Sequence, residues 1–284
     1  MGLRCIINSI QNLYYHIFSQ LILYPLMNFL QKRLDIRFMN LGYVSPPTTY
    51  QSSDKDEIIE KIIAKHLGPN DPIRAHCRLY EKTLSLCPEY PKFSEESSLL
   101  EVGCGLGGGL NWIKCSHNEF ARVIGLDPVT GASGANQSIV NGRAEEMPFP
   151  AQSFDIVLNV ESSHLYANTK KFFAEAYRVL KPGGFLCWAD LRSKEKMDNV
   201  KYEAKECGFE LVAFENIIDG AICGIHETSA RYEMLLSQAP WYIRLFKNTF
   251  RQVYCAPGSK SYNLYINGER VYVVGCWRVP NYVE

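Results

Sequence analysis

Residues 98–127 contain the pattern that most constrains how this chain can fold. A short apolar run, Ser98–Val102, is followed at once by a glycine-rich segment at residues 103–109. A second apolar run, Arg122–Leu126, ends in Asp127. Glycines after a strand let the backbone turn sharply into a helix and let a ligand approach the main chain closely. The pattern predicts a strand, turn, helix and second strand with a ligand site at the turn.

The spacing of the glycines narrows the choice of ligand. Gly103, Gly105 and Gly108 satisfy the GxGxxG dinucleotide pattern. Asp127 follows at the distance where an acid could accept hydrogen bonds from a ribose. The pattern by itself fits NAD and S-adenosylmethionine (SAM) equally. A glycine-rich turn without a ligand is the weaker interpretation, because strand, glycines and acid occur together.

Apolar runs and helical patterns alternate along most of the chain. They predict strands near residues 98–102, 122–126, 138–141, 154–160, 185–189 and 208–214 and helices over 55–67, 73–87 and 170–180. Such alternation is typical of βαβ units with a parallel sheet. We expect an α/β domain over residues 95–284, preceded by an N-terminal helical extension over residues 1–94 that acts as a lid.

The end of the chain predicts two further features. Residues 219–250 read as a late helical insertion that caps the domain. Its aromatic residues form either a packed helix face or the wall of a lipid-sized pocket: Trp241, Tyr242, Phe246 and Phe250. Tyr262–Ile266 and Arg270–Val274 flank Asn267-Gly268, a dipeptide that favours type I′ turns, so we expect a β-hairpin there.

Residues 5–30 predict an amphipathic helix that ends near Pro25. Polar residues interrupt its apolar run, so neither a membrane span nor a signal peptide is expected. The helix packs on the protein's own core or an apolar ligand, or it contacts a membrane surface. We expect a cytoplasmic protein and leave peripheral membrane association open.

Charge and cysteine content exclude several classes of function. Lys+Arg and Asp+Glu are both 30, so the chain carries no bulk charge for binding nucleic acid. The ten cysteines contain no CxxC pair, and we expect most to be buried thiols in a reducing compartment. No cluster has metal-ligand spacing, so no metal is expected. The oligomeric state stays open.

Three later segments distinguish between the two cofactors. These are Gly142–Phe149, Ser153–Leu158 and Val179–Phe185, the last of which contains Lys-Pro-Gly-Gly. Together with Glu101-Val-Gly-Cys-Gly, this set resembles the class I SAM-dependent methyltransferases. The resemblance implies a doubly wound, Rossmann-like sheet that binds SAM, with Asp127 accepting both ribose hydroxyls. It places the cofactor against Glu101, Gly103, Gly105, Gly107, Asp127, Ala144, Glu145 and Asn159.

One position departs from that family. Members often carry Gly-Asp-Ala-Glu where this chain has Gly142-Arg143-Ala144-Glu145. The usual aspartate accepts a hydrogen bond from the adenine amino group, and a guanidinium group cannot. Glu145 or a backbone carbonyl would have to replace it.

A second, narrower resemblance concerns the substrate. Five segments are similar to the phthiotriol/phenolphthiotriol dimycocerosates methyltransferases, which O-methylate a lipid hydroxyl: Tyr24–Met27, Met39–Tyr43, Arg74–Tyr80, Leu158–Tyr166 and Trp188–Arg192. The resemblance implies an apolar, hydroxylated small molecule or lipid as acceptor. The alternatives are N- or C-methylation of a phosphobase or sterol-like acceptor, or a non-catalytic protein with the same fold.

Methyl transfer to a hydroxyl requires a base near the acceptor oxygen. His164 follows the fourth predicted strand, where an open parallel sheet presents its site, and more distant relatives use a histidine at the matching place. Its alternative role is that of a core or surface histidine. Glu161 either orients His164 or lies near the cofactor, and Asp190 is a second candidate base or a helix cap. We expect Asp155 to stabilise a turn and His76 to be a satisfied helix histidine.

Overall fold

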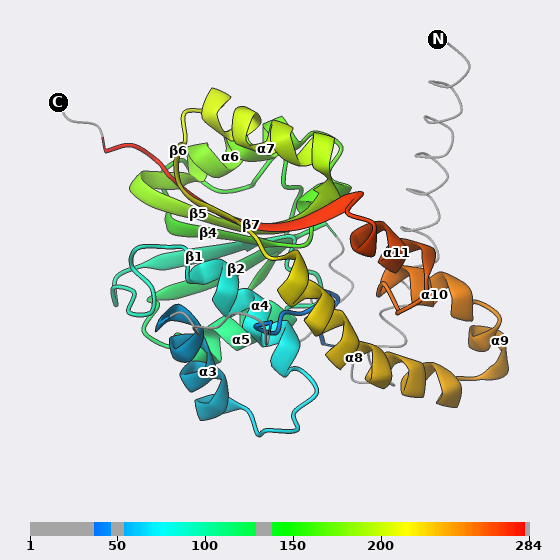
Figure 1. Ribbon diagram of the computed structural model, residues 1–284. Coiled ribbons are helices and arrows are strands. Elements are labelled where there is room, and N and C mark those ends of the chain that lie inside the picture. The colour runs from blue at the N-terminus through cyan, green and yellow to red at the C-terminus, as the bar shows by residue number, and fades with distance from the viewer. Residues whose placement is uncertain (1–36, 47–53, 129–137, 282–284) are drawn as a thin grey trace, which may run out of the picture. The chain divides into compact units, whose positions relative to one another are not determined.

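The computed structural model describes residues 37–46, 54–128 and 138–281 (Figure 1). Residues Phe38–Glu284 form one compact unit, distinct from Met1–Arg37. The amphipathic helix predicted over residues 5–30 lies outside the described residues. Within the described part of the chain, no helix combines the length and the apolar character needed to cross a membrane.

A seven-stranded sheet organises the unit. Its strands are β1 (Ser98–Val102), β2 (Arg122–Asp127), β3 (Ile139–Asn141), β4 (Phe154–Val160), β5 (Leu180–Ser193), β6 (Glu210–Asn216) and β7 (Arg270–Arg278). The strand order is β3-β2-β1-β4-β5-β7-β6. The first five strands pair in parallel, whereas β7 is antiparallel to both β5 and β6. The order reverses beside β1, so the carboxyl ends of β1 and β4 flank the crevice where such sheets bind ligands.

Helices cover both faces of this sheet (Figure 1). They are α3 (Asp54–His66), α4 (Arg74–Leu84), α5 (Gly108–Ser116), the 3-10 helix η2 (Ser163–Leu165), α6 (Thr169–Val179), α7 (Lys194–Glu206), α8 (Ile218–Gln238), α9 (Trp241–Arg244), α10 (Lys247–Val253) and α11 (Lys260–Ile266). Helices α3, α4 and α5 lie on one face, and α6 and α7 lie on the other. The doubly wound fold predicted from the sequence is confirmed.

Side chains alternate between two cores along the strands, as pleating requires. In β1, Leu99 joins the core beneath α3–α5 and Leu100 joins the core beneath α6 and α7. In β5, Cys187 and Trp188 divide in the same way. Because both faces are covered, the strands read as continuous apolar runs. Six of the nine described cysteines are buried free thiols, as predicted.

The compact unit begins earlier than the predicted domain boundary. Helix α4 is almost wholly buried, and its side chains contribute to the core beneath α5. The boundary predicted near residue 94 therefore lies inside this unit. A lid role for the segments before it stays a prediction.

The predicted hairpin is wrong. Residues 260–266 form helix α11, whose first turn is capped by Ser259 accepting a hydrogen bond from the Tyr262 N–H. Gly268 has a φ of 69° and follows the end of this helix. The Asn-Gly signal reports a need for positive φ, which a helix end satisfies as well as a type I′ turn does.

The helical insertion between β6 and β7 is confirmed, and it extends beyond residue 250 to include α11. The packed-face interpretation of its aromatic residues is confirmed for Phe250, which is 7% exposed. Trp241 and Phe246 are 73% and 49% exposed. The Tyr242 side chain lies outside the described residues.

Candidate functional site

The glycine loop joins the carboxyl end of β1 to α5. Gly103, Gly105 and Gly107 have φ values of 73°, 52° and 80°, which favour glycine. A Cβ on Gly103 would lie 2.4 Å from Ser162 Oγ, so that position also lacks space for a side chain. At these three positions the loop has no side chains that could cover its main chain, where it borders the crevice at the carboxyl end of β1.

Glu101 lies in β1 directly before this loop and is 1% exposed. The Tyr80 hydroxyl donates to Glu101 Oε1 at 2.7 Å, but Oε2 is buried and has no partner among the described residues. Burial raises the pKa of Glu101 to about 8, and the charge of Asp127 adds to the rise. An unsatisfied carboxyl oxygen at this depth is costly unless a ligand contacts it.

Asp127 and Asn159 lie on either side of the loop, at the ends of β2 and β4. The Gly105 N–H donates to Asp127 Oδ2 at 2.8 Å, which ties the loop to the second strand. Asn159 donates through Nδ2 to the Val102 carbonyl at 2.9 Å, and its Oδ1 is buried without a described partner. Strand ends and loop thus gather Glu101, the glycines, Asp127 and Asn159 into one place.

His164 lies in η2, just after β4. Its Nδ1 lies 2.7 Å from Asp190 Oδ1, at the carboxyl end of the neighbouring strand β5. The His164 side chain is 27% exposed, whereas Asp190 is fully buried. Burial alone would lower the pKa of His164, but the Asp190 carboxylate raises it above its usual value. The structure joins two of the predicted site residues in a histidine–carboxylate pair.

Two neighbouring side chains contact the second oxygen of the Asp190 carboxylate. Ser163 donates to Asp190 Oδ2, and Arg192 contacts the same oxygen at 3.2 Å. Trp188 Nε1 in turn donates to Ser163 Oγ at 2.9 Å. Burial would raise the pKa of Asp190, but the His164 charge and these contacts lower it. The carboxylate stays ionised and faces the imidazole in a fixed orientation.

Glu161 does not orient His164, because its hydrogen bonds go to other residues. Its Oε1 accepts from the Leu41 N–H at 2.7 Å and from the Tyr272 hydroxyl at 2.6 Å. Burial raises its pKa to about 7. Its φ of 48° is unusual for a residue with a Cβ, and such strain clusters at functional sites. Asp190, and not Glu161, makes the hydrogen bond to the His164 ring.

The segment around Arg143 differs from the other cofactor candidates. Ala144 is buried, and Glu145 Oε1 accepts from the Ala167 N–H at 2.9 Å. The Arg143 side chain is 62% exposed and lies 3.7 Å from Glu145 Oε2. Glu145 thus holds the chain before α6, and an adenine contact from it stays a prediction.

His76 has the contacts of a buried helix histidine, as expected, whereas Asp155 was expected to stabilise a turn and instead connects neighbouring strands. His76 Nδ1 lies 2.9 Å from Asn40 Oδ1, its ring stacks on Phe38, and burial lowers its pKa to about 4. Asp155 accepts hydrogen bonds from the Ser98 N–H at 2.8 Å and from Lys181 Nζ. These two contacts join the amino ends of β1, β4 and β5.

Sequence reasoning missed Ser163, Arg192 and Tyr272. Arg192 lies two residues after Asp190 on the same strand, so period-two alternation could have placed both on one face. Tyr272 had no such signal, because its position depends on the antiparallel pairing of β7 with β5, where Tyr272 faces Leu191.

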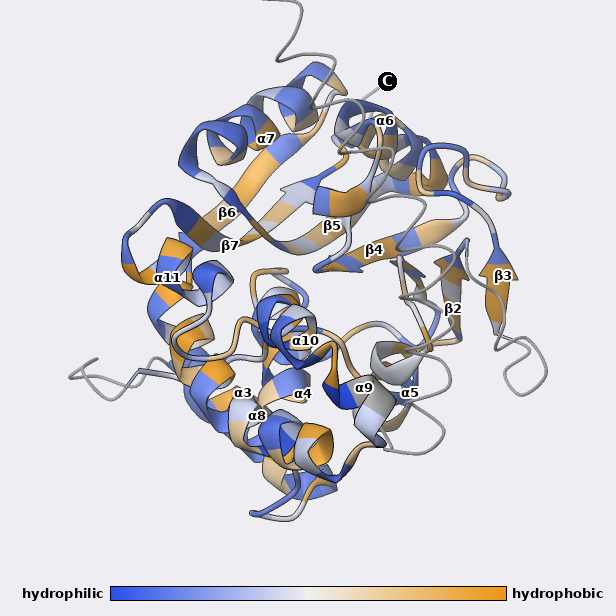
Figure 2. Cartoon of the chain, turned by 90° about the vertical axis from the view of Figure 1, so that its right-hand side faces the viewer, coloured by the Kyte–Doolittle hydropathy of each residue, from blue (hydrophilic) through white to orange (hydrophobic). Residues whose placement is uncertain are grey.

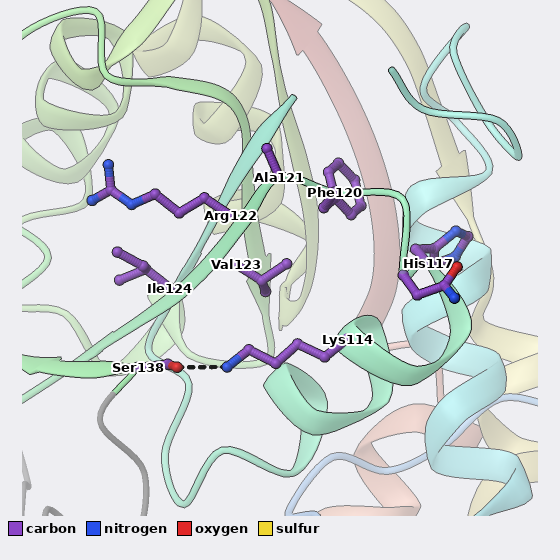
Figure 3. A pocket seen from close by; sticks show the side chains of 9 residues that line it. Lys114, His117, Phe120, Ala121, Arg122, Val123, Ile124 and Ser138 are labelled. Carbon is purple, nitrogen blue, oxygen red and sulfur yellow. Dashed lines mark hydrogen bonds between the residues drawn. The ribbon is translucent and has the colours of Figure 1, made fainter. Parts of the chain in front are cut away.

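A pocket of about 410 Å³ lies elsewhere in the unit (Figure 3). Lys114, Phe120 and Arg122 contribute to its lining, and Lys114 Nζ donates to Ser138 Oγ at 2.6 Å. It lies where β2 begins, whereas Asp127 lies where β2 ends. We therefore separate it from the candidate site. Within the described residues, no group of three His, Cys, Asp or Glu side chains is arranged to hold a metal ion.

Comparisons with known proteins identify the family. A family model described as a methyltransferase domain matches residues 100–188. The phthiotriol/phenolphthiotriol dimycocerosates methyltransferase of Mycobacterium leprae is 30% identical over 258 residues, covering 85% of this chain and 88% of that protein. The chain belongs to this methyltransferase family. It is a class I SAM-dependent methyltransferase, as the sequence motifs predicted.

One further relative and one solved structure are also similar to this methyltransferase. A fatty-acid O-methyltransferase of Mycolicibacterium smegmatis is 34% identical over 171 residues, covering 56% of this chain and 54% of that protein. A phosphoethanolamine N-methyltransferase of Haemonchus contortus, solved with S-adenosylhomocysteine, has a TM-score of 0.55 at 20% identity, covering 71% of this chain and 52% of that one. The structural similarity shows the shared fold.

The bare main chain of the glycine loop and the unsatisfied Glu101 and Asn159 oxygens fit SAM as the cofactor. A sulfonium cofactor with an amino group and a ribose offers the donors that these acceptors lack.

Proposed function

We propose that this methyltransferase transfers the SAM methyl group to a hydroxyl oxygen of an apolar lipid, with His164 as the base and Asp190 as its positioning residue. The observation that carries the proposal is the 2.7 Å contact between His164 Nδ1 and the buried Asp190 carboxylate at the carboxyl ends of β4 and β5. When bound, SAM supplies an electrophilic methyl group on sulfur. Residues of this chain would bind the cofactor, position the acceptor and remove its proton.

On the cofactor side, the proposal gives each gathered group a task. Glu101 Oε2 accepts from the cofactor's amino group, and Asp127 accepts from the ribose hydroxyls. Gly103, Gly105 and Gly107 allow the cofactor to lie against the main chain. The buried Asn159 and Ala144 limit the space beside it, and Glu145 remains the candidate for the adenine end. Glu101 Oε2, which has no partner among the described residues, supports the first of these assignments.

On the acceptor side, the tautomer of His164 matters most. With Nδ1–H donating to Asp190, the neutral ring carries its lone pair on Nε2. Bound SAM would supply the methyl group that the acceptor oxygen takes, with S-adenosylhomocysteine as the other product, and His164 Nε2 would accept the hydroxyl proton. The resulting imidazolium faces the Asp190 carboxylate, which stabilises it. Removing the proton in this way is worth roughly 100- to 10,000-fold in rate.

An apolar acceptor is supported by the relatives and by the surroundings of the base. The M. leprae enzyme is named for phthiotriol and phenolphthiotriol lipids, and the M. smegmatis relative for fatty acids. Here, Leu165 beside the base is 57% exposed, and Met39 beside Gly105 is 45% exposed. Apolar side chains exposed at a site favour an apolar ligand.

The test offers the full chain and methyl-labelled SAM a panel of acceptors: a long-chain diol, a free fatty acid and phosphoethanolamine. We expect a labelled methyl ether from the diol, identified by mass spectrometry. Labelling of phosphoethanolamine nitrogen alone would contradict the hydroxyl assignment. A labelled fatty-acid ester without ether would replace the hydroxyl with a carboxylate acceptor.

A matched pair of histidine variants tests the base. His164→Ala should slow ether formation by roughly 100- to 10,000-fold. His226→Ala should leave it unchanged, because His226 lies on the exposed side of α8 and contacts Tyr262. Both variants should bind S-adenosylhomocysteine like the wild type. Full ether formation by His164→Ala would remove His164 from the mechanism.

A further inference from the structure

Helices α9 and α10, with the two residues that join them, carry exposed apolar side chains to which the proposed function gives no task. We define the α9–α10 surface by four exposed side chains: Trp241, Leu245, Phe246 and Val253. Trp241, at the start of α9, and Leu245, just after its end, are 73% and 72% exposed. Trp241, Leu245 and Phe246 fall within six residues of the sequence, and large exposed apolar side chains that lie close together are typical of an interaction site.

The same part of the chain is basic. Between residues 230 and 266 there are five cations, Arg231, Arg244, Lys247, Arg251 and Lys260, and a single carboxylate, Glu233. Glu233 contacts both Lys247, at 3.3 Å, and Arg251. The chain as a whole has a formal net charge of zero, so this local excess is positive against a neutral background.

The α9–α10 surface belongs to the insertion that leaves and rejoins the sheet at its catalytic edge. Helix α8 follows β6, and β7 begins where β5 ends, with Val273 facing Asp190. Tyr254 after α10 packs on Tyr232 of α8 at 5.0 Å between ring centroids. Figure 2 shows α8 to α11 together on the side of the molecule that faces the viewer.

We propose that the α9–α10 surface docks this methyltransferase on an anionic lipid bilayer. Tryptophan, leucine and phenylalanine enter the boundary between headgroups and acyl chains, and lysine and arginine bind the anionic headgroups. Arg244 and Lys247 stand next to Leu245 and Phe246 in sequence, so apolar and basic groups share one short segment.

Charge favours a bilayer over the two other possible occupants. Residues 1–36 contain Arg4, Lys32 and Arg33 against a single acid, Asp35, so they carry the same sign as the α9–α10 surface. A second copy of this surface is equally basic. An anionic bilayer is complementary to it in both charge and hydrophobicity.

Docking would bring the catalytic edge to the phase in which an apolar acceptor is dissolved. This benefit to catalysis rests on the proposed function, whereas the docking itself does not. Vesicle binding requires neither cofactor nor acceptor, so failure of the docking proposal and failure of the proposed function give separate results.

The native tryptophans supply a site-specific readout. Trp112, Trp188 and Trp277 are 5%, 0% and 1% exposed, and Trp241 is 73% exposed. The full chain is mixed with vesicles of phosphatidylcholine, or of phosphatidylcholine with about one-third phosphatidylglycerol. With the anionic vesicles we expect blue-shifted tryptophan emission, quenching by brominated lipid and protection from aqueous acrylamide. Protein that floats with vesicles while acrylamide still quenches Trp241 would overturn the proposal, because another segment would then be docking.

Two variants and a matched control test the surface itself. Leu245→Glu should weaken binding to anionic vesicles by roughly ten-fold or more, and Arg244→Glu should weaken it in a salt-dependent manner. Leu211→Glu, at a 51% exposed leucine on β6, should bind like the wild type. Wild-type binding by Leu245→Glu would overturn the proposal. Protection of Trp241 that rises with protein concentration without vesicles would do the same, by assigning the surface to a second copy.

Discussion

The proposed cofactor side and the proposed acceptor side of this site are built in different ways. Glu101, Gly103 and Asp127 come from one continuous βαβ unit, and several of their contacts use the main chain. The acceptor side joins His164 to Asp190 on the next strand, and Glu161 to Leu41 and Tyr272, which lie 120 and 111 residues away in sequence.

The two sides therefore depend on different features of the chain. Main-chain contacts require an unhindered backbone, so glycine positions determine the cofactor side. The acceptor side requires side chains from distant segments to meet, so packing determines it. Changes on the cofactor side should therefore alter affinity, and changes on the acceptor side should alter turnover.

The largest effect is expected for His164→Ala. Loss of the base should lower kcat by roughly 100- to 10,000-fold, while the dissociation constant of S-adenosylhomocysteine stays within about two-fold. Single-turnover kinetics and calorimetry measure the two quantities separately. An equal loss in both would show that the two sides are not independent.

Asp127→Ala should produce the opposite pattern. Hydrogen bonds to a charged group are worth about 1.5–3 kcal/mol, so S-adenosylhomocysteine should bind roughly 10- to 100-fold more weakly. At saturating SAM, kcat should remain close to that of the wild type. Asp155→Asn, at a carboxylate on the opposite edge of the sheet, provides the control, and a similar affinity loss there would indicate general destabilisation.

Asp190→Asn should change the pH dependence of turnover. The Asp190 carboxylate raises the pKa of His164, so removing its charge lowers that pKa. Because the neutral imidazole is the base, activity appears as pH rises through the His164 pKa, and the variant's acid limb should shift to lower pH. Its plateau rate should fall by less than in His164→Ala. An unchanged acid limb would assign that limb to another group.

The smallest effect is expected in the pH dependence of the free energy of unfolding, through a buried histidine–carboxylate pair. His117 and Glu81 are buried and lie 3.1 Å apart, joining α4 to the end of α5. Burial would lower the pKa of His117, but Glu81 raises it above its unfolded value. This contribution to stability is fully present below the unfolded pKa and is lost as pH rises through the folded pKa. Urea unfolding at several pH values should show that loss in the wild type and not in His117→Gln.

The comparison also explains which predictions could be made from the sequence. The strands, the parallel core of the sheet and the glycine loop follow from apolar runs and glycine spacing, which are local signals. His164 and Asp190 could be named because each follows a predicted strand, but their mutual contact could not. The Asn267-Gly268 signal was misinterpreted because positive φ serves a helix end as well as a hairpin.

The sequence alone determined the fold class, through its apolar runs and glycine spacing. It determined the SAM-dependent activity through its resemblance to the class I SAM-dependent methyltransferases. Only the tertiary structure decided that Asp190 contacts His164, that Glu161 contacts Tyr272, and that Trp241 faces solvent. These facts depend on which strands become neighbours and which helix faces remain uncovered. No local pattern of residues contains that information, because packing between distant segments sets it.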